Sequence, residues 1–196
     1  MITKKNKLFF LLSLSMGLIV IISNYLVQFP VNYYELQNVL TYGAFSYPIT
    51  FLVTDLANRA YGKIVARKIV NIGFIVGITL TLLISTNFSD TISIRIALGS
   101  GLAFLIAQNL DVQVFDKLRN HIWFIAPFIS SLIGSAIDTF LFFFIAFYKT
   151  GLPWVTLAIG DFFIKLLIAL IMLIPFRLLL SKVQEVGSYK TKKNFF

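Results

Sequence analysis

Four aspartates interrupt stretches of the chain that are otherwise apolar. They are Asp55, Asp111, Asp138 and Asp161, and Lys165 follows the last of them by one helical turn. A charged side chain at the centre of a bilayer costs about 3 kcal/mol on insertion scales, so such residues usually face a bundle interior and line the path of a substrate or ion. A structural ion pair, or a hydrogen bond between helices, is the other explanation for any single one of them. We expect the set to include residues that bind a substrate or couple its movement to an ion.

The composition is that of an integral membrane protein. Of the 196 residues, 58% are hydrophobic and 13% are charged, whereas soluble domains carry about 25% charged residues. Cysteine is absent and His121 is the only histidine, which leaves little for thiolate metal sites, cysteine nucleophiles or a Ser–His–Asp triad. We therefore expect no catalytic residues, no metal site and no cofactor. The net charge of +9 lies in short loops and tails, where membrane orientation explains it better than nucleic-acid binding does.

Six segments are long and apolar enough to cross a bilayer, which takes about 20 residues in a helix. They cover residues 8–29, 39–58, 69–86, 96–115, 122–148 and 155–180. Pro48, Pro127 and Pro175 lie inside them, a pattern typical of kinked or broken membrane helices. The first segment is too long for the apolar part of a signal peptide. The sequence predicts an all-α integral membrane protein, a bundle of six transmembrane helices that forms a single domain over residues 1–196.

Basic residues are divided unequally between the two sides of the predicted bundle. With the N-terminus inside, fourteen of the seventeen Lys and Arg residues fall in cytoplasmic loops and tails. Arg95 and Lys149 fall on the other side, and Lys165 is within the membrane. Because loops rich in Lys and Arg stay in the cytoplasm, we expect both termini to be cytoplasmic.

Helical periodicity places amide side chains near the acidic ones. Asn24 lies on the polar face of the first segment. On the second segment Asn58 lies close to Asp55, and on the fourth Gln108 shares a broad face with Asp111. Five of the six segments carry a polar stripe of this kind, so a common interior is the simplest way to satisfy all of them.

Local spacing suggests ion partners for two of the acids. Asp161 and Lys165 are spaced as an i, i+4 ion pair, and Asp55 has Arg59 at the same spacing. The other two aspartates have no basic residue at that distance along the chain. Lys165 could also pair with Asp138, and one positive charge among three acids leaves a net negative site.

Several short motifs resemble those of the queuosine precursor transporters, also called the VUT family. They are Asn24–Gln28, Tyr42–Pro48, Phe51–Arg59, Gln108–Arg119, Trp123–Pro127, Asp138–Phe147 and Asp161–Lys165. The resemblance implies a multi-pass importer of the bacterial inner (plasma) membrane that takes up 7-deazaguanine precursors of the tRNA nucleoside queuosine for salvage. The segment Thr86–Arg95 is short, so an outer gate built there could differ from that of other members.

A 7-deazaguanine, such as the 7-cyano or 7-aminomethyl compound, suits these side chains chemically. Its N1–H and 2-amino group are parallel donors that a carboxylate accepts as a bidentate pair. Its carbonyl needs a donor such as an Asn or Gln amide, its ring needs an aromatic face, and an aminomethyl cation would favour a negative site. The residues expected to bind substrate or to couple its transport are Asn24, Asp55, Asn58, Gln108, Asp111, Asp138, Asp161 and Lys165.

Other functions stay open at this level. The chain could be the substrate-binding subunit of an energy-coupling-factor importer, which would need a separate ATPase because no phosphate-binding loop is present. A non-transporting membrane scaffold is another alternative, although interior carboxylates have no use in it. The expected partners are a purine-like small molecule and the lipid bilayer, not nucleic acid, and oligomerisation is left open.

Overall fold

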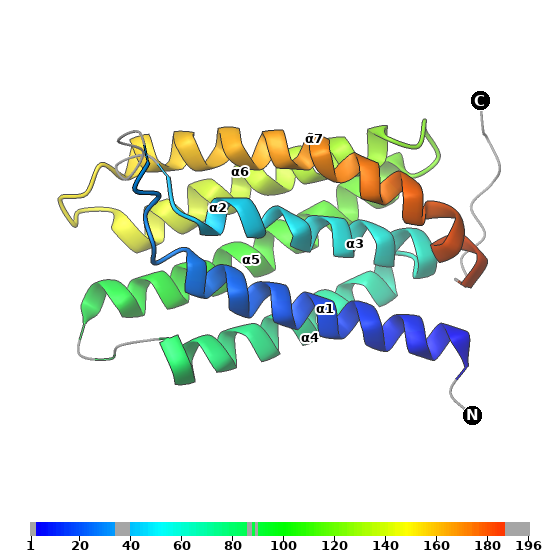
Figure 1. Cartoon of the computed structure of the whole chain (residues 1–196), viewed down its shortest axis with the longest axis horizontal. Coiled ribbons are helices and arrows are strands. Elements are labelled where there is room, and N and C mark those ends of the chain that lie inside the picture. The colour runs from blue at the N-terminus through cyan, green and yellow to red at the C-terminus, as the bar shows by residue number, and fades with distance from the viewer. Residues whose placement is uncertain (1–2, 34–39, 86–87, 89, 187–196) are drawn as a thin grey trace.

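Helices make up nearly all of the computed structural model, which describes residues 3–33, 40–85, 88 and 90–186. In chain order they are α1 (Lys4–Leu26), α2 (Gly43–Ser46), α3 (Pro48–Tyr61), α4 (Lys63–Leu80), the π-helix η2 (Thr81–Ser85), α5 (Thr91–Leu118), α6 (Ile125–Phe147) and α7 (Trp154–Val186). They run roughly along the long axis of the molecule and form one bundle (Figure 1). The predicted all-α architecture is confirmed.

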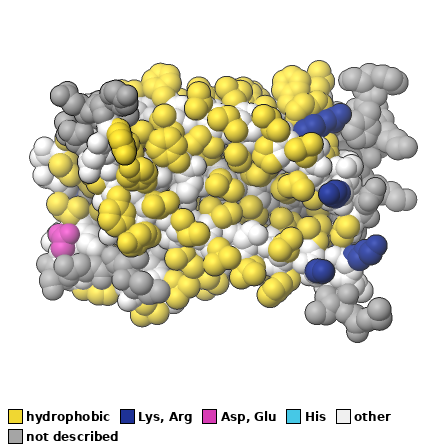
Figure 2. Space-filling view, viewed as in Figure 1, with side chains coloured by type: hydrophobic (Ala, Val, Ile, Leu, Met, Phe, Trp, Pro, Cys, Tyr) yellow, Lys and Arg dark blue, Asp and Glu magenta, His cyan; other side chains and the backbone are white. Residues whose placement is uncertain are grey.

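Five helical stretches among the described residues are long and apolar enough to cross a membrane: α1, α4 with the start of η2, α5, α6 and α7. They correspond to five of the six predicted segments. Large apolar side chains cover the sides of the bundle (Figure 2), as expected of a surface that contacts lipid. α4 begins at Lys63 rather than near residue 69. The basic residues that precede the apolar run, Lys63, Arg67 and Lys68, are themselves part of the helix.

The remaining segment, predicted over residues 39–58 with Pro48 inside it as a sign of a kink or break, is divided at that proline. α2 and α3 meet at Tyr47 and Pro48. Proline cannot donate to the helical ladder but fits the first turn of a new helix, so Pro48 ends α2 and begins α3. α3 has 14 residues, about 21 Å of helix. It contacts α1, α4, α5, α6 and α7, so this broken segment occupies the centre of the bundle (Figure 1).

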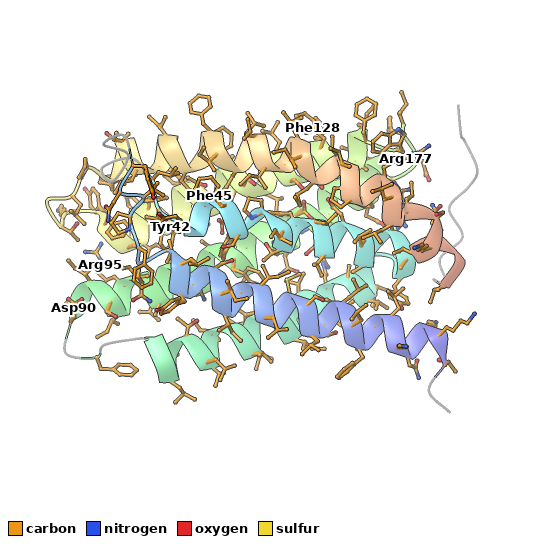
Figure 3. The ribbon with its side chains drawn as sticks, viewed as in Figure 1. Tyr42, Phe45, Asp90, Arg95, Phe128 and Arg177 are labelled. Atoms are coloured by element: carbon orange, nitrogen blue, oxygen red, sulfur yellow. The ribbon has the colours of Figure 1, made fainter. Side chains whose placement is uncertain are left out.

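The two ends of the bundle differ in charge. α1 begins and α7 ends at the same end (Figure 1), where Lys and Arg side chains gather (Figure 2). There Asp116 bonds to Arg119 at 2.9 Å and to Lys63 at 3.7 Å. Arg177 lies at this end and Asp90 at the other (Figure 3). Asp90 caps α5 by accepting from two backbone N–H groups of its first turn, both at 3.1 Å.

Two glycines allow α1 and α4 to pack closely. A Cβ atom added to Gly73 would lie 2.2 Å from Met16 Cγ, and one added to Gly77 would lie 2.2 Å from Val20 Cγ1. Both distances are far inside van der Waals contact. The pair therefore sets the separation of these helices, as small residues four apart commonly do in membranes.

Candidate functional site

Three charged side chains meet between α6 and α7, and we call Asp138, Asp161 and Lys165 the charged triad. Lys165 Nζ lies 2.6 Å from Asp161 Oδ2 and 2.8 Å from Asp138 Oδ2. It also donates to Thr139 Oγ1 at 3.1 Å, and that hydroxyl donates to Asp161 Oδ2 at 2.7 Å. All three charged residues are buried. The expected i, i+4 pair is confirmed, and the same lysine binds Asp138 as well.

The charged triad is not fully satisfied from within the protein. Two carboxylates face one ammonium, so the ionised triad carries a net charge of −1. Asp138 Oδ1 is buried and has no hydrogen-bond partner among the described residues. Because buried polar atoms are almost always hydrogen-bonded, this oxygen is an acceptor available to a bound molecule.

A cavity lies against the charged triad. Tyr47 and Phe142 give it aromatic walls, and Asn24 and Ser100 add polar groups. Tyr47 marks the break between α2 and α3, and its ring centroid lies 5.1 Å from Lys165 Nζ. A broken helix beside a central cavity is the arrangement that many transporters use to bind substrate.

Asn24 is held in the cavity wall by two side-chain hydrogen bonds. Its Nδ2 donates to Thr81 Oγ1 at 2.9 Å, and its Oδ1 accepts from the Ser100 hydroxyl. Thr81 is the first residue of η2, so the change from α- to π-helix occurs at the residue that orients this amide. Since Nδ2 carries two hydrogens, the Asn24 amide has a second donor to offer to the cavity.

Sequence reasoning had not selected Tyr47, Ser100 or Phe142. Phe142 follows Asp138 by one helical turn, and Tyr47 shares the face of the second segment with Asn58, so periodicity carried a signal for these two. The sequence contained no such signal for Ser100, because it lies among small and apolar residues.

A second acidic site, which we call the acid pair, consists of Asp55 on α3 and Asp111 on α5. The two carboxylates are neighbours that act on each other electrostatically. Ser130 and Ser131 of α6 donate to Asp55 at 3.2 and 3.4 Å. Asp111 is fully buried, and neither of its oxygens has a hydrogen-bond partner in the part of the chain that the structure describes.

Arg59 does not form the ion pair with Asp55 that its spacing suggested. Its guanidinium donates instead to the Arg119 carbonyl at 2.8 Å and lies 5.2 Å from the centroid of the Phe115 ring. Arg59 acts on Asp55 only through space. Among the described residues, the acid pair thus lacks the direct cationic contact that the charged triad has.

Asn58 and Gln108 form hydrogen bonds between α3 and α5. Gln108 Nε2 donates to Thr50 Oγ1 at 2.7 Å, and Gln108 Oε1 accepts from Thr54. Asn58 Nδ2 donates to the Val112 carbonyl at 2.9 Å. Each of these two amides uses one N–H inside the protein, and neither lines the cavity, whereas Asn24 does.

Comparison with known proteins points to one family. The profile described as "Putative vitamin uptake transporter" matches residues 41–180. The chain is 36% identical over 192 residues to the queuosine precursor transporter of Escherichia coli (strain K12), covering 88% of this chain and 86% of that protein. It is 34% identical over 189 residues to the probable queuosine precursor transporter of Haemophilus influenzae, covering 80% and 79%, and 32% identical over 157 residues to that of Bacillus subtilis, covering 68% of each. No solved structure matches the chain.

Proposed function

The chain belongs to the family of putative vitamin uptake transporters and is a multi-pass membrane transporter, not an enzyme; we propose that it imports queuosine precursors across a bacterial inner membrane. The proposed substrates are 7-deazaguanines such as 7-cyano- and 7-aminomethyl-7-deazaguanine. The names of relatives matched over most of the chain support this class. The observation on which the proposal rests is the buried Asp138 Oδ1, unpaired among the described residues, beside a cavity lined by aromatic and polar side chains.

In this proposal Asp138 recognises the guanine edge. Oδ1 is free to accept one of the two parallel donors, N1–H or the 2-amino group. Oδ2 is bonded to Lys165, but a carboxylate oxygen has a second lone pair and can accept the other donor. Both interactions would be charge-assisted and buried, and such bonds are stronger than neutral ones.

The other groups of the cavity complete the proposed site. The second Asn24 N–H would donate to the ring carbonyl, and Tyr47 and Phe142 would cover the ring faces. Asp161 holds Lys165 in position. The net charge of −1 would favour the cationic aminomethyl compound. We assign the acid pair to coupling rather than to contact with the substrate, and Asn58 and Gln108 to the support of α3 against α5.

Uptake of radiolabelled 7-cyano-7-deazaguanine by cells that express the chain tests the proposed function. Label should accumulate in these cells and not in cells with an empty vector. Unlabelled guanine analogues should compete, whereas adenine should not, because it lacks the carbonyl and the N1–H that the site would require, and sites built around buried hydrogen bonds discriminate strongly. Equal labelling of both cell types would contradict the proposal.

We also propose that both termini are cytoplasmic, which the gathering of Lys and Arg at the end where α1 begins supports (Figure 2). Reporter fusions after residue 196 and in the loop near Asn32 should report opposite sides of the membrane. A cytoplasmic signal is expected from the first and a periplasmic one from the second. The same side for both would contradict six crossings.

A subunit of an energy-coupling-factor importer remains the alternative mechanism. It predicts that an ATPase module co-purifies with the tagged chain in mild detergent and that uptake requires it. Purified chain that transports substrate in liposomes without ATP would exclude this mechanism, and the same result would exclude a scaffold without transport activity.

A further inference from the structure

The acid pair is separate from the substrate cavity yet built on the same helices. Ser130, which donates to Asp55, and Asp138, which lines the cavity, are eight residues apart on α6, about 12 Å along the helix axis. Tyr47 of the cavity and Asp55 are separated by the same number of residues across the start of α3. A change at either site can therefore reach the other through α3 and α6 without the two sites sharing a ligand.

A second cavity reaches Asp55 of the acid pair. Asp55 and Ser131 are its polar lining residues, and Pro48 and Pro127 lie in its wall. The side that α7 contributes is apolar: Ala169, Met172, Leu173 and Phe176. Asp55 therefore lines a cavity that shares no lining residue with the one beside the charged triad.

The charged groups around the acid pair do not neutralise it. Asp55 faces Asp111 of α5, the hydroxyls of Ser130 and Ser131 of α6, and at longer range Arg59 of its own helix. On α7, Asp161 and Lys165 bond within the triad. Arg177, which follows Phe176 of this cavity, has its guanidinium 5.0 Å from the centroid of the Trp123 ring. The charged residues of α4 lie in its first turns, where Lys63 forms an ion pair with Asp116.

In the described part of the chain no cation contacts these two neighbouring buried carboxylates, and such a pair cannot be fully ionised without a large energetic cost. An isolated buried charge is strongly disfavoured, and two like charges in contact repel, so such a pair retains a proton. The two partnerless oxygens of Asp111 are the natural place for it, facing the carboxylate of Asp55. Binding forms an O–H bond at a carboxylate oxygen, and release returns the proton to water.

We propose that the acid pair, Asp55 and Asp111, binds the coupling proton, so that the protein is a proton symporter. This inference rests on the proposed function, because the proton is moved together with the substrate of the cavity. The proton binds from the outer side with the substrate and is released with it to the cytoplasm. Transport then needs no ATPase, since the pH gradient supplies the energy.

Liposomes that contain the purified full-length chain test this inference. The probe is tritiated 7-cyano-7-deazaguanine, which is uncharged, with the membrane potential clamped to zero by potassium and an ionophore. Two activities are measured: exchange of internal for external substrate at equal pH, and net accumulation with the outside more acidic. With one proton per substrate, a gradient of about one pH unit should support about tenfold accumulation. An internal pH indicator should show acidification when substrate is added.

Asp111→Asn should separate the two activities. Asparagine keeps the volume but cannot exchange a proton, so the variant should retain exchange and lose the tenfold accumulation. Asp90→Asn is the matched control and should keep both, because Asp90 is exposed and asparagine is an equally good helix cap. The acidification of wild-type liposomes tests proton movement even if Asp111→Asn does not fold.

The outcomes distinguish this inference from the proposed function. Wild-type protein that exchanges substrate but neither responds to the pH gradient nor acidifies the lumen would overturn proton coupling and leave the transporter proposal intact. Accumulation driven by a sodium gradient at equal pH would overturn it too. Gradient-driven accumulation by Asp111→Asn would remove Asp111 from the coupling site. Wild-type protein without exchange would instead contradict the proposed function.

Discussion

Asp138→Asn should lose most uptake of a labelled 7-deazaguanine while remaining in the membrane at a near-normal level. Asparagine replaces one carboxylate oxygen by a donor, which would oppose a donor of the guanine edge. The loss of a charge-assisted pair is about 2–4 kcal/mol, or about a 30- to 1,000-fold decrease in kcat/KM. Folding should be retained, because Lys165 keeps its contact with Asp161 at 2.6 Å and the triad becomes neutral.

An analogue without the 2-amino group sharpens this test. If Asp138 accepts from that group, the analogue should be transported poorly by the wild-type protein but should lose little more in the Asp138→Asn variant, because the interaction is already absent. Asp90→Asn serves as the control for an aspartate outside the cavity. Normal uptake by Asp138→Asn, at normal abundance, would remove Asp138 from the binding site.

Most of the fold was predictable because membrane helices are defined by length and composition. Five predicted segments agree with observed helices to within several residues. The remaining segment, residues 39–58, is broken at Pro48, as a proline inside a membrane helix indicates. Hydropathy alone could not show this break, because most residues of α3 are buried by protein and need not contact lipid.

Contacts among the candidate residues were predictable where they are local along the chain. The Asp161–Lys165 pair is local, so its spacing was sufficient. Contacts of Asp138 with Lys165 and of Asp55 with Asp111 depend on how each helix is rotated against its neighbour. A single sequence gives the polar face of a helix but not the helix that this face meets.

The sequence also could not separate amides that bind a ligand from amides that join two helices. Asn24, Asn58 and Gln108 were equivalent candidates for the substrate carbonyl, since each lies on a polar face. In the structure the amides of Asn58 and Gln108 donate across α3 and α5, and Asn24 alone of the three lines the cavity. Helix-to-helix hydrogen bonds and ligand contacts use the same chemistry, so only packing distinguishes them.

Lys165→Met should strongly reduce the amount of protein in the membrane. The change leaves Asp138 and Asp161 buried, close together and without their shared cation. Removing one partner of a buried ion pair typically costs about 3–5 kcal/mol, which is a large part of the stability of an ordinary domain. Abundance by immunoblot and the midpoint of thermal unfolding in detergent should both fall. Lys149→Met is the control, because Lys149 is exposed near Tyr148 at the end of α6 and should be silent.

Removing acids from the Lys165→Met variant should restore stability in steps. Asp161→Asn together with Lys165→Met leaves one carboxylate and should be more abundant than Lys165→Met alone. Adding Asp138→Asn removes the last charge and should restore abundance furthest, without restoring uptake, because the recognition carboxylate is then gone. Since Lys165 contacts both acids, the effects should be non-additive. A double variant less abundant than both of its single variants would show that Asp161 and Lys165 are not energetic partners, and Asp138 would then be the acid that Lys165 neutralises.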